Sequence, residues 1–308
     1  MLFLNRRGLM GSVSCRACGH VIKCPHCDVS LSLHKNRKLV CHYCGYEEDV
    51  PKVCPACGSK YIGGFKAGTE KIEEVVRETF PNARTLRMDA DTTKGKDSHQ
   101  NILNAFANHE ADVLIGTQMI VKGHDFSNVT LMGIMAADMS LNASDYRGAE
   151  RTFQMITQAA GRAGRGDKPG RVIIQTYQPD NYSVLSAAGQ DYDQFYEMES
   201  AFRKMMNYPP FCHMLSVQIT SEKESEAAGK AKLLGEFLKA KSYGVLIFGP
   251  QDAAIAKLKD VYRKVIYIRD TDYEKLVAIK DDLEELLLNE NRFRLAYVSF
   301  DFDPTNGF

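Results

Sequence analysis

Eight of the nine cysteines lie between positions 15 and 57, in four pairs whose members are separated by two residues. Two thiolates at this spacing can bind one ion from a tight turn, and four thiolates complete the tetrahedral shell of Zn2+. The regular pairing predicts two zinc sites, and a disulfide framework is the alternative. The pairs are Cys15 and Cys18, Cys24 and Cys27, Cys41 and Cys44, and Cys54 and Cys57.

The spacing between the pairs favours a nested arrangement of the two sites. Only five residues separate the first two pairs, which is a short link for two turns that face each other, whereas a hairpin-sized thirteen residues separate the second pair from the third. The expected inner ligands are Cys24, Cys27, Cys41 and Cys44. The expected outer ligands are Cys15, Cys18, Cys54 and Cys57. A crossed, RING-like pairing is the alternative.

Other side chains near these cysteines have less specific roles. Four histidines could replace thiolates as ligands, but with eight thiolates present we expect them around the sites instead. They are His20, His26, His34 and His42. Residues 1–45 carry seven Lys or Arg against one acid, Asp28, which suits contact with phosphate; a solvated basic face is the alternative. We expect Cys212 to be a small buried side chain.

Two strings in the middle of the chain carry groups that could bind phosphate. The first is GTQMIVKGHDF, which begins at Gly116 and offers the side chains of Thr117, Gln118 and Lys122 beside a second glycine, Gly123. The second is QAAGRAGR, with Gln158, Arg162 and Arg165. A guanidinium group suits the charge that develops on a γ-phosphate. Either string alone has an ordinary explanation, since glycine-rich helix ends with basic residues are common.

The elements that must position these strings alternate between short apolar strands and amphipathic helices. From Tyr61 the apolar runs YIGGF, RTLRM, DVLIG, TLMGIMAA and RVIIQTY alternate with helical patterns, one of which follows Thr69 as the expected N-cap. This order predicts an α/β fold with a parallel sheet covered by helices. Ligands bind at the carboxyl ends of such strands, so we expect the loops after Ile115 and Ala137 to carry the site.

The C-terminal third forms a separate unit. After a helical stretch, Tyr208-Pro209-Pro210 predicts a boundary, and the pattern beyond it reads strand, helix, strand, strand, helix, strand. We therefore expect a cysteine-rich module over 1–60, an α/β lobe over 61–180, a helical linker over 181–210 and a βαββαβ domain over 211–308. In the last domain, Lys257, Lys259, Arg263 and Lys264 could meet phosphate, and Tyr262 could stack on a base or pack internally.

Composition excludes several classes of protein. The 308 residues are 44% hydrophobic, with 39 basic and 39 acidic side chains, which argues against disorder and collagen-like repeats. No apolar run approaches the ~20 residues of a membrane span. The first residues place an apolar patch ahead of the arginines, the reverse of a secretory signal, so we expect a cytoplasmic protein.

These motifs together resemble a known family. GTQMIVKGHDF followed by QAAGRAGR resembles motifs V and VI in the second RecA-like lobe of superfamily 2 helicases. The whole chain resembles the PriA family of bacterial primosomal replication-restart helicases, through LFLNRRG ahead of the cysteine pairs, FKAGTEKIEEVV, DADTT, DYRGAER, GPQDAAIAKLKDVYRKVI and DFDP. Leu9 and Gly148 depart from this pattern, at positions where the family favours an aromatic residue and an alanine.

The resemblance implies a fold and an activity. It implies two nested zinc sites, a RecA-like lobe with a two-zinc, eight-cysteine insertion, and a C-terminal domain that contacts branched DNA. Arg162 and Arg165, supported by Gln158, would lie near the ATP γ-phosphate, and Gly116, Thr117, Gln118, Lys122 and Gly123 would couple nucleotide to DNA. The implied function is that of an ATP-dependent 3'-to-5' DNA helicase that recognises stalled or branched forks and initiates primosome assembly. The implied partners are forked and single-stranded DNA, single-stranded DNA-binding protein, other primosome proteins and the replicative helicase loader.

Two motifs of such a helicase are missing from the sequence. It contains neither the G-x-x-x-x-G-K-[ST] loop that cradles phosphates nor an acidic D-E-x-H motif for Mg2+. We therefore expect the chain to be the C-terminal portion of a larger protein, without ATPase activity by itself. The alternatives are a non-catalytic, zinc-stabilised module that binds DNA or protein, and another superfamily 2 translocase, of the RecG or nucleosome-remodelling type.

Overall fold

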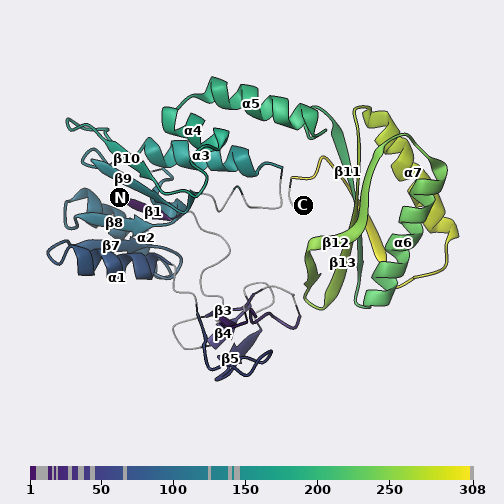
Figure 1. Cartoon of the computed structure of the whole chain (residues 1–308), viewed down its shortest axis with the longest axis horizontal. Helices are drawn as coiled ribbons and strands as arrows, with labels where there is room; N and C mark the ends of the chain where they lie inside the picture. The colour runs from purple at the N-terminus through teal and green to yellow at the C-terminus, as the bar shows by residue number, and fades with distance from the viewer. Residues whose placement is uncertain are drawn as a thin grey trace. The chain divides into compact units, whose positions relative to one another are not determined.

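A computed structural model of the chain divides into two compact units, which are residues 1–11 with 64–199, and residues 12–63 with 200–308 (Figure 1). Within them the structure describes residues 1–4, 13–15, 17–18, 20–26, 30–33, 38–41, 46–64, 68–123, 126–137, 141 and 146–305. Each unit is described by itself below. No helix in these ranges is both long enough and apolar enough to cross a membrane.

The first unit contains a five-stranded sheet whose strands all run parallel. Its order is β10 (Arg171–Ile174), β9 (Leu131–Met135), β1 (Leu2–Leu4), β8 (Val113–Gly116) and β7 (Thr85–Met88). The parallel lobe expected from the alternating pattern is therefore present. The sequence places residues 1–60 in one module, whereas the structure places β1 at the centre of this sheet.

Helices flank this sheet and contribute to its core. They are α1 (Thr69–Thr79), α2 (Ser98–Ala107), α3 (Gly148–Ala160), α4 (Tyr182–Gly189) and α5 (Tyr192–Met205). Phe3 from β1, Leu114 from β8 and Ile134 from β9 are fully buried with Ile156 of α3 in one apolar cluster. Burial of these side chains stabilises the unit without any bound ion.

The cysteine-rich module in the second unit is built from short strands. β2 (Val13–Cys15) pairs with β6 (Ile62–Gly64), and a separate antiparallel sheet contains β3 (Ser32–Leu33), β4 (Lys38–Val40) and β5 (Glu47–Asp49). The YIGGF run is therefore a strand, but its partner is β2 rather than the parallel sheet. β2 and β6 bring the two ends of the module together, since they lie near residues 15 and 60.

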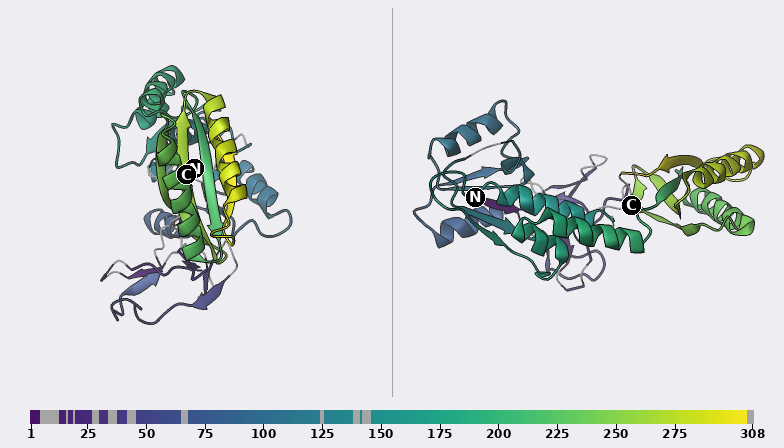
Figure 2. Two further views of the ribbon diagram at one scale, coloured as in Figure 1. Left: turned by 90° about the vertical axis from the view of Figure 1, so that its right-hand side faces the viewer. Right: turned by 90° about the horizontal axis from the view of Figure 1, so that it is seen from above.

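The C-terminal domain has the predicted βαββαβ order. It contains β11 (His213–Ser221), α6 (Glu224–Lys241), β12 (Leu246–Leu258), β13 (Val261–Asp270), α7 (Tyr273–Asn289) and β14 (Tyr297–Phe302). The antiparallel sheet has the order β12-β13-β11-β14, and both helices cover one face of it (Figures 1 and 2). Leu234 and Leu238 of α6 and Leu276 of α7 pack there against Val217 and Ile266.

Candidate functional site

The four cysteines expected to form the outer site lie together in the structure. The sulfur atoms of Cys15, Cys18, Cys54 and Cys57 all lie within 4.8 Å of one another. Two of the distances, Cys15 to Cys57 and Cys18 to Cys54, are 3.7 Å. A tetrahedral zinc with Zn–S bonds of about 2.3 Å needs sulfur atoms about 3.8 Å apart. The geometry of these four thiols therefore fits a zinc ion.

The backbone around the cysteines repeats the same turn. The amide of Cys15 donates to the carbonyl of His20, that of Cys41 to Tyr46 and that of Cys54 to Ser59, each at 2.8 Å and each across five residues. This repeat relates one cysteine of the expected inner site to two of the outer site. The first cysteine of three of the four pairs therefore makes the same backbone hydrogen bond across five residues.

Amide groups also point at the sulfur atoms. The amide of Ala17 donates to Cys15 Sγ, and the amide of His26 donates to Cys24 Sγ, each at 3.4 Å. The backbone N–H of Cys18 has the largest influence on the Cys15 thiol, and with that of Ala17 it lowers the pKa of Cys15 to about 6. Because a metal binds the thiolate and not the thiol, these donors favour the ligating form of Cys15 and Cys24. At Cys57 the backbone hydrogen bond from Ser59 is outweighed by the neighbouring thiols and burial, which raise the pKa of Cys57 to about 12.

The inner set is described in part. Cys24 and Cys41 are buried and share one apolar cluster with Val13 and Leu31. Cys27 and Cys44 lie outside the described residues, as do His34 and His42. The ring of His26 contacts Asp260 and none of the described sulfur atoms. Cys212 is buried, as expected, and its thiol donates to the carbonyl of Asn207.

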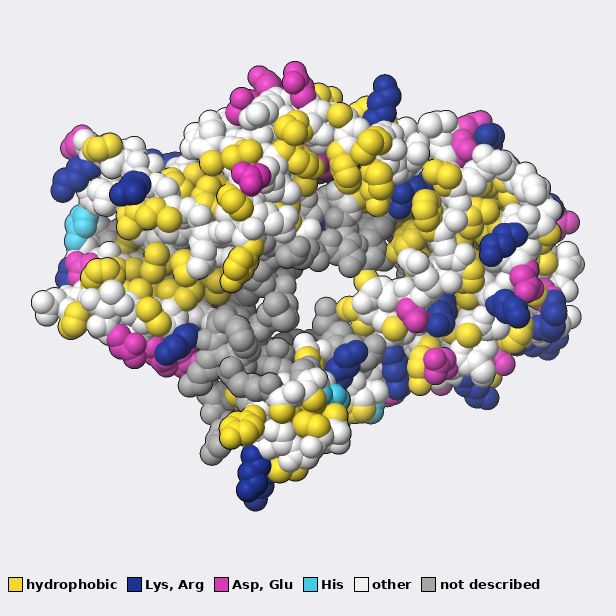
Figure 3. Space-filling view, viewed as in Figure 1, with side chains coloured by type: hydrophobic (Ala, Val, Ile, Leu, Met, Phe, Trp, Pro, Cys, Tyr) yellow, Lys and Arg dark blue, Asp and Glu magenta, His cyan; other side chains and the backbone are white. Residues whose placement is uncertain are grey.

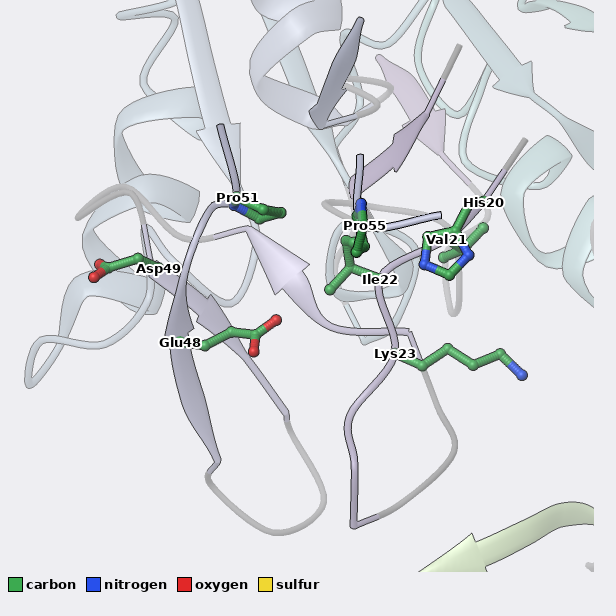
Figure 4. Close-up of a pocket in the computed structure, with 8 residues that line it drawn as sticks. All are labelled: His20, Val21, Ile22, Lys23, Glu48, Asp49, Pro51 and Pro55. Atoms are coloured by element: carbon green, nitrogen blue, oxygen red, sulfur yellow. The ribbon is translucent and has the colours of Figure 1, made fainter. Parts of the chain in front are cut away.

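A cavity of about 400 Å³ lies in the cysteine-rich module. Figure 4 shows His20 and Lys23 on one side of it and Glu48 with Asp49 on the other. The remaining lining residues are Val21, Ile22, Pro51 and Pro55. Since both signs of charge line it, the cavity does not have the one-signed lining of an anion site or of a cation site.

The GTQMIVKGHDF string begins at the carboxyl end of β8, as predicted. A side chain at Gly116 would meet the carbonyl oxygen of Met88 at 2.5 Å, so only glycine allows β7 and β8 to approach this closely. Thr117 and Gln118 follow half-buried, the latter opening a short 3-10 turn, η1 (Gln118–Ile120). Lys122 is exposed. The next residue, Gly123, has a φ of +72°, which glycine adopts without strain.

The QAAGRAGR string forms the end of α3 and a tight loop. Gln158 is exposed on the last turn of the helix, Arg162 is half-buried directly after it, and Arg165 Nε donates to the carbonyl of Gly161 at 2.6 Å. Gly164 has a φ of +76°, and its amide donates to the carbonyl of Val129 at 2.9 Å. The glycines thus let the loop lie against the neighbouring chain while it holds two guanidinium groups.

The two strings lie at opposite ends of the parallel strands. Val129 and Thr130 directly precede β9, and the amide of Arg171, the first residue of β10, donates to the carbonyl of Thr130. The arginine loop therefore lies at the amino ends of β9 and β10. The reason is that a helix between two parallel strands runs back along the sheet, so its end returns to the edge where the next strand begins.

A buried aspartate at the end of β7, Asp89, is not among the residues predicted from the sequence. Asp89 is 4% exposed, and its carboxylate accepts hydrogen bonds from the Thr69 hydroxyl at 2.5 Å and from the amides of Asp91 and Thr92. Burial is the largest influence and raises the pKa of Asp89, but these hydrogen bonds and Arg87 outweigh it and lower the pKa. The prediction of Thr69 as N-cap was wrong: Gly68 is the N-cap and Thr69 is the first residue of α1, with its hydroxyl bound to Asp89. The DADTT string is the signal that could have indicated this arrangement.

Three stretches of the chain match known families. Residues 62–167 match the helicase conserved C-terminal domain, residues 24–48 the PriA DNA helicase Cys-rich region domain, and residues 204–305 the primosomal protein N C-terminal domain. The first unit is therefore a helicase C-terminal lobe of the RecA-like class. The match to the Cys-rich region, together with the four convergent thiols, supports zinc binding by the module.

The relatives agree with this assignment. The replication restart protein PriA of Bacillus subtilis (strain 168) is 44% identical over 306 residues, which cover 99% of this chain and 38% of that protein. The PriA proteins of a Synechocystis species and of Chlamydia pneumoniae are 41% and 38% identical, and the matches cover 37% and 41% of their lengths. The chain belongs to the PriA family, and it spans about two fifths of the length of these relatives.

Proposed function

We propose that the first unit is the second RecA-like lobe of an ATP-dependent DNA helicase that acts at stalled or branched replication forks. The observation that carries this proposal is the glycine-rich loop after α3, which places Arg162 and Arg165 at the amino ends of β9 and β10. Membership in the PriA family supports the wider function, which is 3'-to-5' translocation and the start of primosome assembly.

The arginines have the chemistry that phosphoryl transfer needs. In our proposal Arg162 and Arg165 approach the γ-phosphate and stabilise the charge that develops there, with Gln158 beside them. ATP with Mg2+ supplies the phosphoryl group, which another part of the longer protein would hold. The sequence of this chain contains no phosphate-binding loop, so we propose that it does not hydrolyse ATP alone.

The GTQMIVKGHDF segment would couple this site to DNA. It begins at the carboxyl end of β8, the neighbour of the outer strand β7. Further along the chain, the side chain of Asn128 contacts His109 at 2.8 Å. The carbonyl of Val129, the next residue, accepts a hydrogen bond from the amide of Gly164 in the arginine loop. Thr117, Gln118 and Lys122 are thus connected through one short segment to the arginines, with Gly116 and Gly123 shaping its path.

We also propose two zinc ions, in the nested arrangement. The outer four thiols have zinc geometry, and the Cys41 amide makes the same five-residue hydrogen bond as the amides of Cys15 and Cys54, which supports the inner set of Cys24, Cys27, Cys41 and Cys44. Bound zinc would supply the folding free energy of the module. The proposed role of the ions is structural.

The proposed partners are forked and single-stranded DNA, single-stranded DNA-binding protein, other primosome proteins and the helicase loader, in the cytoplasm at the nucleoid. Figure 3 shows Lys and Arg side chains mixed with Asp and Glu over the C-terminal domain, without a continuous basic surface on that face. Lys257 and Lys264 already pair with Asp260 and Asp252, so phosphate contacts there would require these pairs to open.

The test is a chimera in which this chain replaces the matching segment of the Bacillus subtilis protein. We expect Arg162→Ala to reduce DNA-stimulated ATP hydrolysis by at least about 100-fold while nucleotide still binds, since arginine fingers contribute about 10³–10⁵ in rate. Arg77→Ala, which removes an exposed arginine of α1 in the same lobe, is the matched control. Unchanged hydrolysis by the Arg162 variant would overturn the assignment.

A non-catalytic module that binds DNA or protein is the second candidate. The observation in its favour is the absence of a phosphate-binding loop from the sequence. The same chimera separates the two functions, because a binding module would leave ATP hydrolysis independent of both Arg162 and Arg165.

A further inference from the structure

The tip of the β12–β13 hairpin touches the cysteine-rich module at the turn that begins with Cys24. The amide of Asp260 donates to the carbonyl of His26 at 2.8 Å, and Lys257 Nζ donates to the carbonyl of Pro25 at 2.9 Å. Both acceptors belong to the two residues directly after Cys24. The hairpin therefore forms hydrogen bonds with the backbone of an expected metal-binding turn.

Side chains extend the contact to the second expected turn of the inner site. His26 Nδ1 lies 2.5 Å from Asp260 Oδ2, and the His26 ring packs edge-on against the ring of Tyr46 at 5.3 Å. Tyr46 closes the turn of Cys41, because its carbonyl accepts the Cys41 amide. Through His26, the hairpin tip is thus connected to the turns of both Cys24 and Cys41.

An apolar contact completes the junction. Leu258, the last residue of β12, packs against the module's buried cluster, which contains Cys24 and Cys41 together with Val13, Ile22, Leu31 and Leu39. These are the described cysteines of the inner set. Any change in the positions of their sulfur atoms would alter the surface that receives Leu258, because such cores are close-packed.

The turn at the tip is shaped for this contact. Lys259 and Asp260 both have positive φ, 50° and 62°, a combination that favours glycine and asparagine in two-residue hairpins. Aspartate tolerates this conformation better than most residues, and here its carboxylate is the group that meets His26. The tip therefore uses a residue with a binding group where a plain turn would use glycine.

We propose that the hairpin tip is a latch, in which docking of the C-terminal domain on the Cys24 turn and metal binding at the inner cysteine site strengthen each other. This inference rests on the proposed second zinc ion. A contact that requires the metal-bound turn must, by reciprocity, increase the affinity of that turn for the metal. Release of the inner ion would then free the C-terminal domain from the module while the outer site stays closed.

The test compares zinc release from the wild-type chain and from a Leu258→Ala/Asp260→Asn variant, measured as transfer to a coloured chelator. We expect two ions per chain in both proteins and two release phases, one of which is accelerated about 10-fold in the variant, a typical size for coupling between sites. The matched control is Asp252→Asn, which removes the ion pair with Lys264 elsewhere in the hairpin. It should leave both phases unchanged.

The outcomes separate the latch from the proposal on which it rests. One zinc ion in the wild-type chain would contradict the two-site proposal, whereas two ions with unchanged release from the variant would overturn the latch alone. Equal acceleration in the Asp252 control would also overturn it. Hydrogen exchange on the wild-type chain gives a second test, since zinc removal should expose the Asp260 amide while Val217 in β11 stays protected; protection at Asp260 after zinc removal would contradict the latch.

Discussion

The cysteine-rich module and the C-terminal domain belong to one compact unit, yet different forces stabilise them. The buried cluster of the C-terminal domain joins both of its helices to the sheet through twelve residues, whereas the described part of the module has a cluster of six, two of them cysteines. Strands of two or three residues add few backbone hydrogen bonds to the module. A region without a sizeable core needs another source of folding free energy, and the converging thiols provide it when metal is bound.

Removal of zinc should produce the largest difference in stability between the module and the C-terminal domain. Metal binding contributes about 10 kcal/mol or more to such modules, so a strong chelator should unfold the module and leave the C-terminal domain folded. We expect the amides of Cys15, Cys41 and Cys54 to lose hydrogen-exchange protection, while those of Val217 and Ile266 keep it. Simultaneous loss of protection in both regions would contradict the claim that different forces stabilise the module and the C-terminal domain.

A core substitution should give the reverse result. Leu234 of α6 is fully buried, and Leu234→Ala should lower the free energy of unfolding of the C-terminal domain by about 3 kcal/mol, through lost burial and a cavity. Denaturant unfolding and zinc analysis of the same sample measure this. Leu288→Ala, at an 84% exposed position of α7, should have almost no effect. Zinc loss from the Leu234 variant under native conditions would show that the two regions do not fold separately.

The helicase lobe resembles the C-terminal domain in having an apolar core, and it buries the carboxylate of Asp89. Asp89→Asn should destabilise this lobe by about 2 kcal/mol, because a buried carboxylate loses charged hydrogen bonds to Thr69 and two amides. Since the folded pKa of Asp89 is lowered from 3.8, its contribution is complete above that pH and is lost as the pH falls through the lower folded value.

Unfolding of this variant should be followed as a function of pH. The difference from the wild type should be constant near neutrality and should shrink in acid. Asp91→Asn, which changes an exposed carboxylate in the same segment, serves as the matched control. A difference that grows toward low pH would contradict the direction of the pKa shift.

Local patterns were sufficient to predict most elements. The βαββαβ order follows from long runs such as ESEAAGKAKLLGEFLKA, which the structure shows as α6, and the five-residue link between cysteine pairs favours the outer set that the structure brings together. These features depend on periodicity and on short loops. Their physical causes lie within neighbouring residues.

Partners of short strands could not be predicted in the same way. β1 contains three residues and carries no periodic signal, yet it occupies the centre of the parallel sheet between β8 and β9. YIGGF reads as a strand but pairs with β2, about fifty residues earlier, and the arginine loop lies at the end of the strands opposite to Gly116. Each of these results depends on chain topology, which a local pattern does not contain.

The most direct test of the arginine assignment is ATP hydrolysis by this chain, with and without forked DNA, alone and mixed with the part of the Bacillus subtilis PriA protein that it does not match. Circular dichroism would first show that both pieces are folded. We expect no hydrolysis by the chain alone and DNA-stimulated hydrolysis in the mixture that depends on Arg162 and Arg165. Hydrolysis by the chain alone, or hydrolysis in the mixture that survives loss of both arginines, would contradict the proposal that this lobe contributes arginines to a site completed elsewhere.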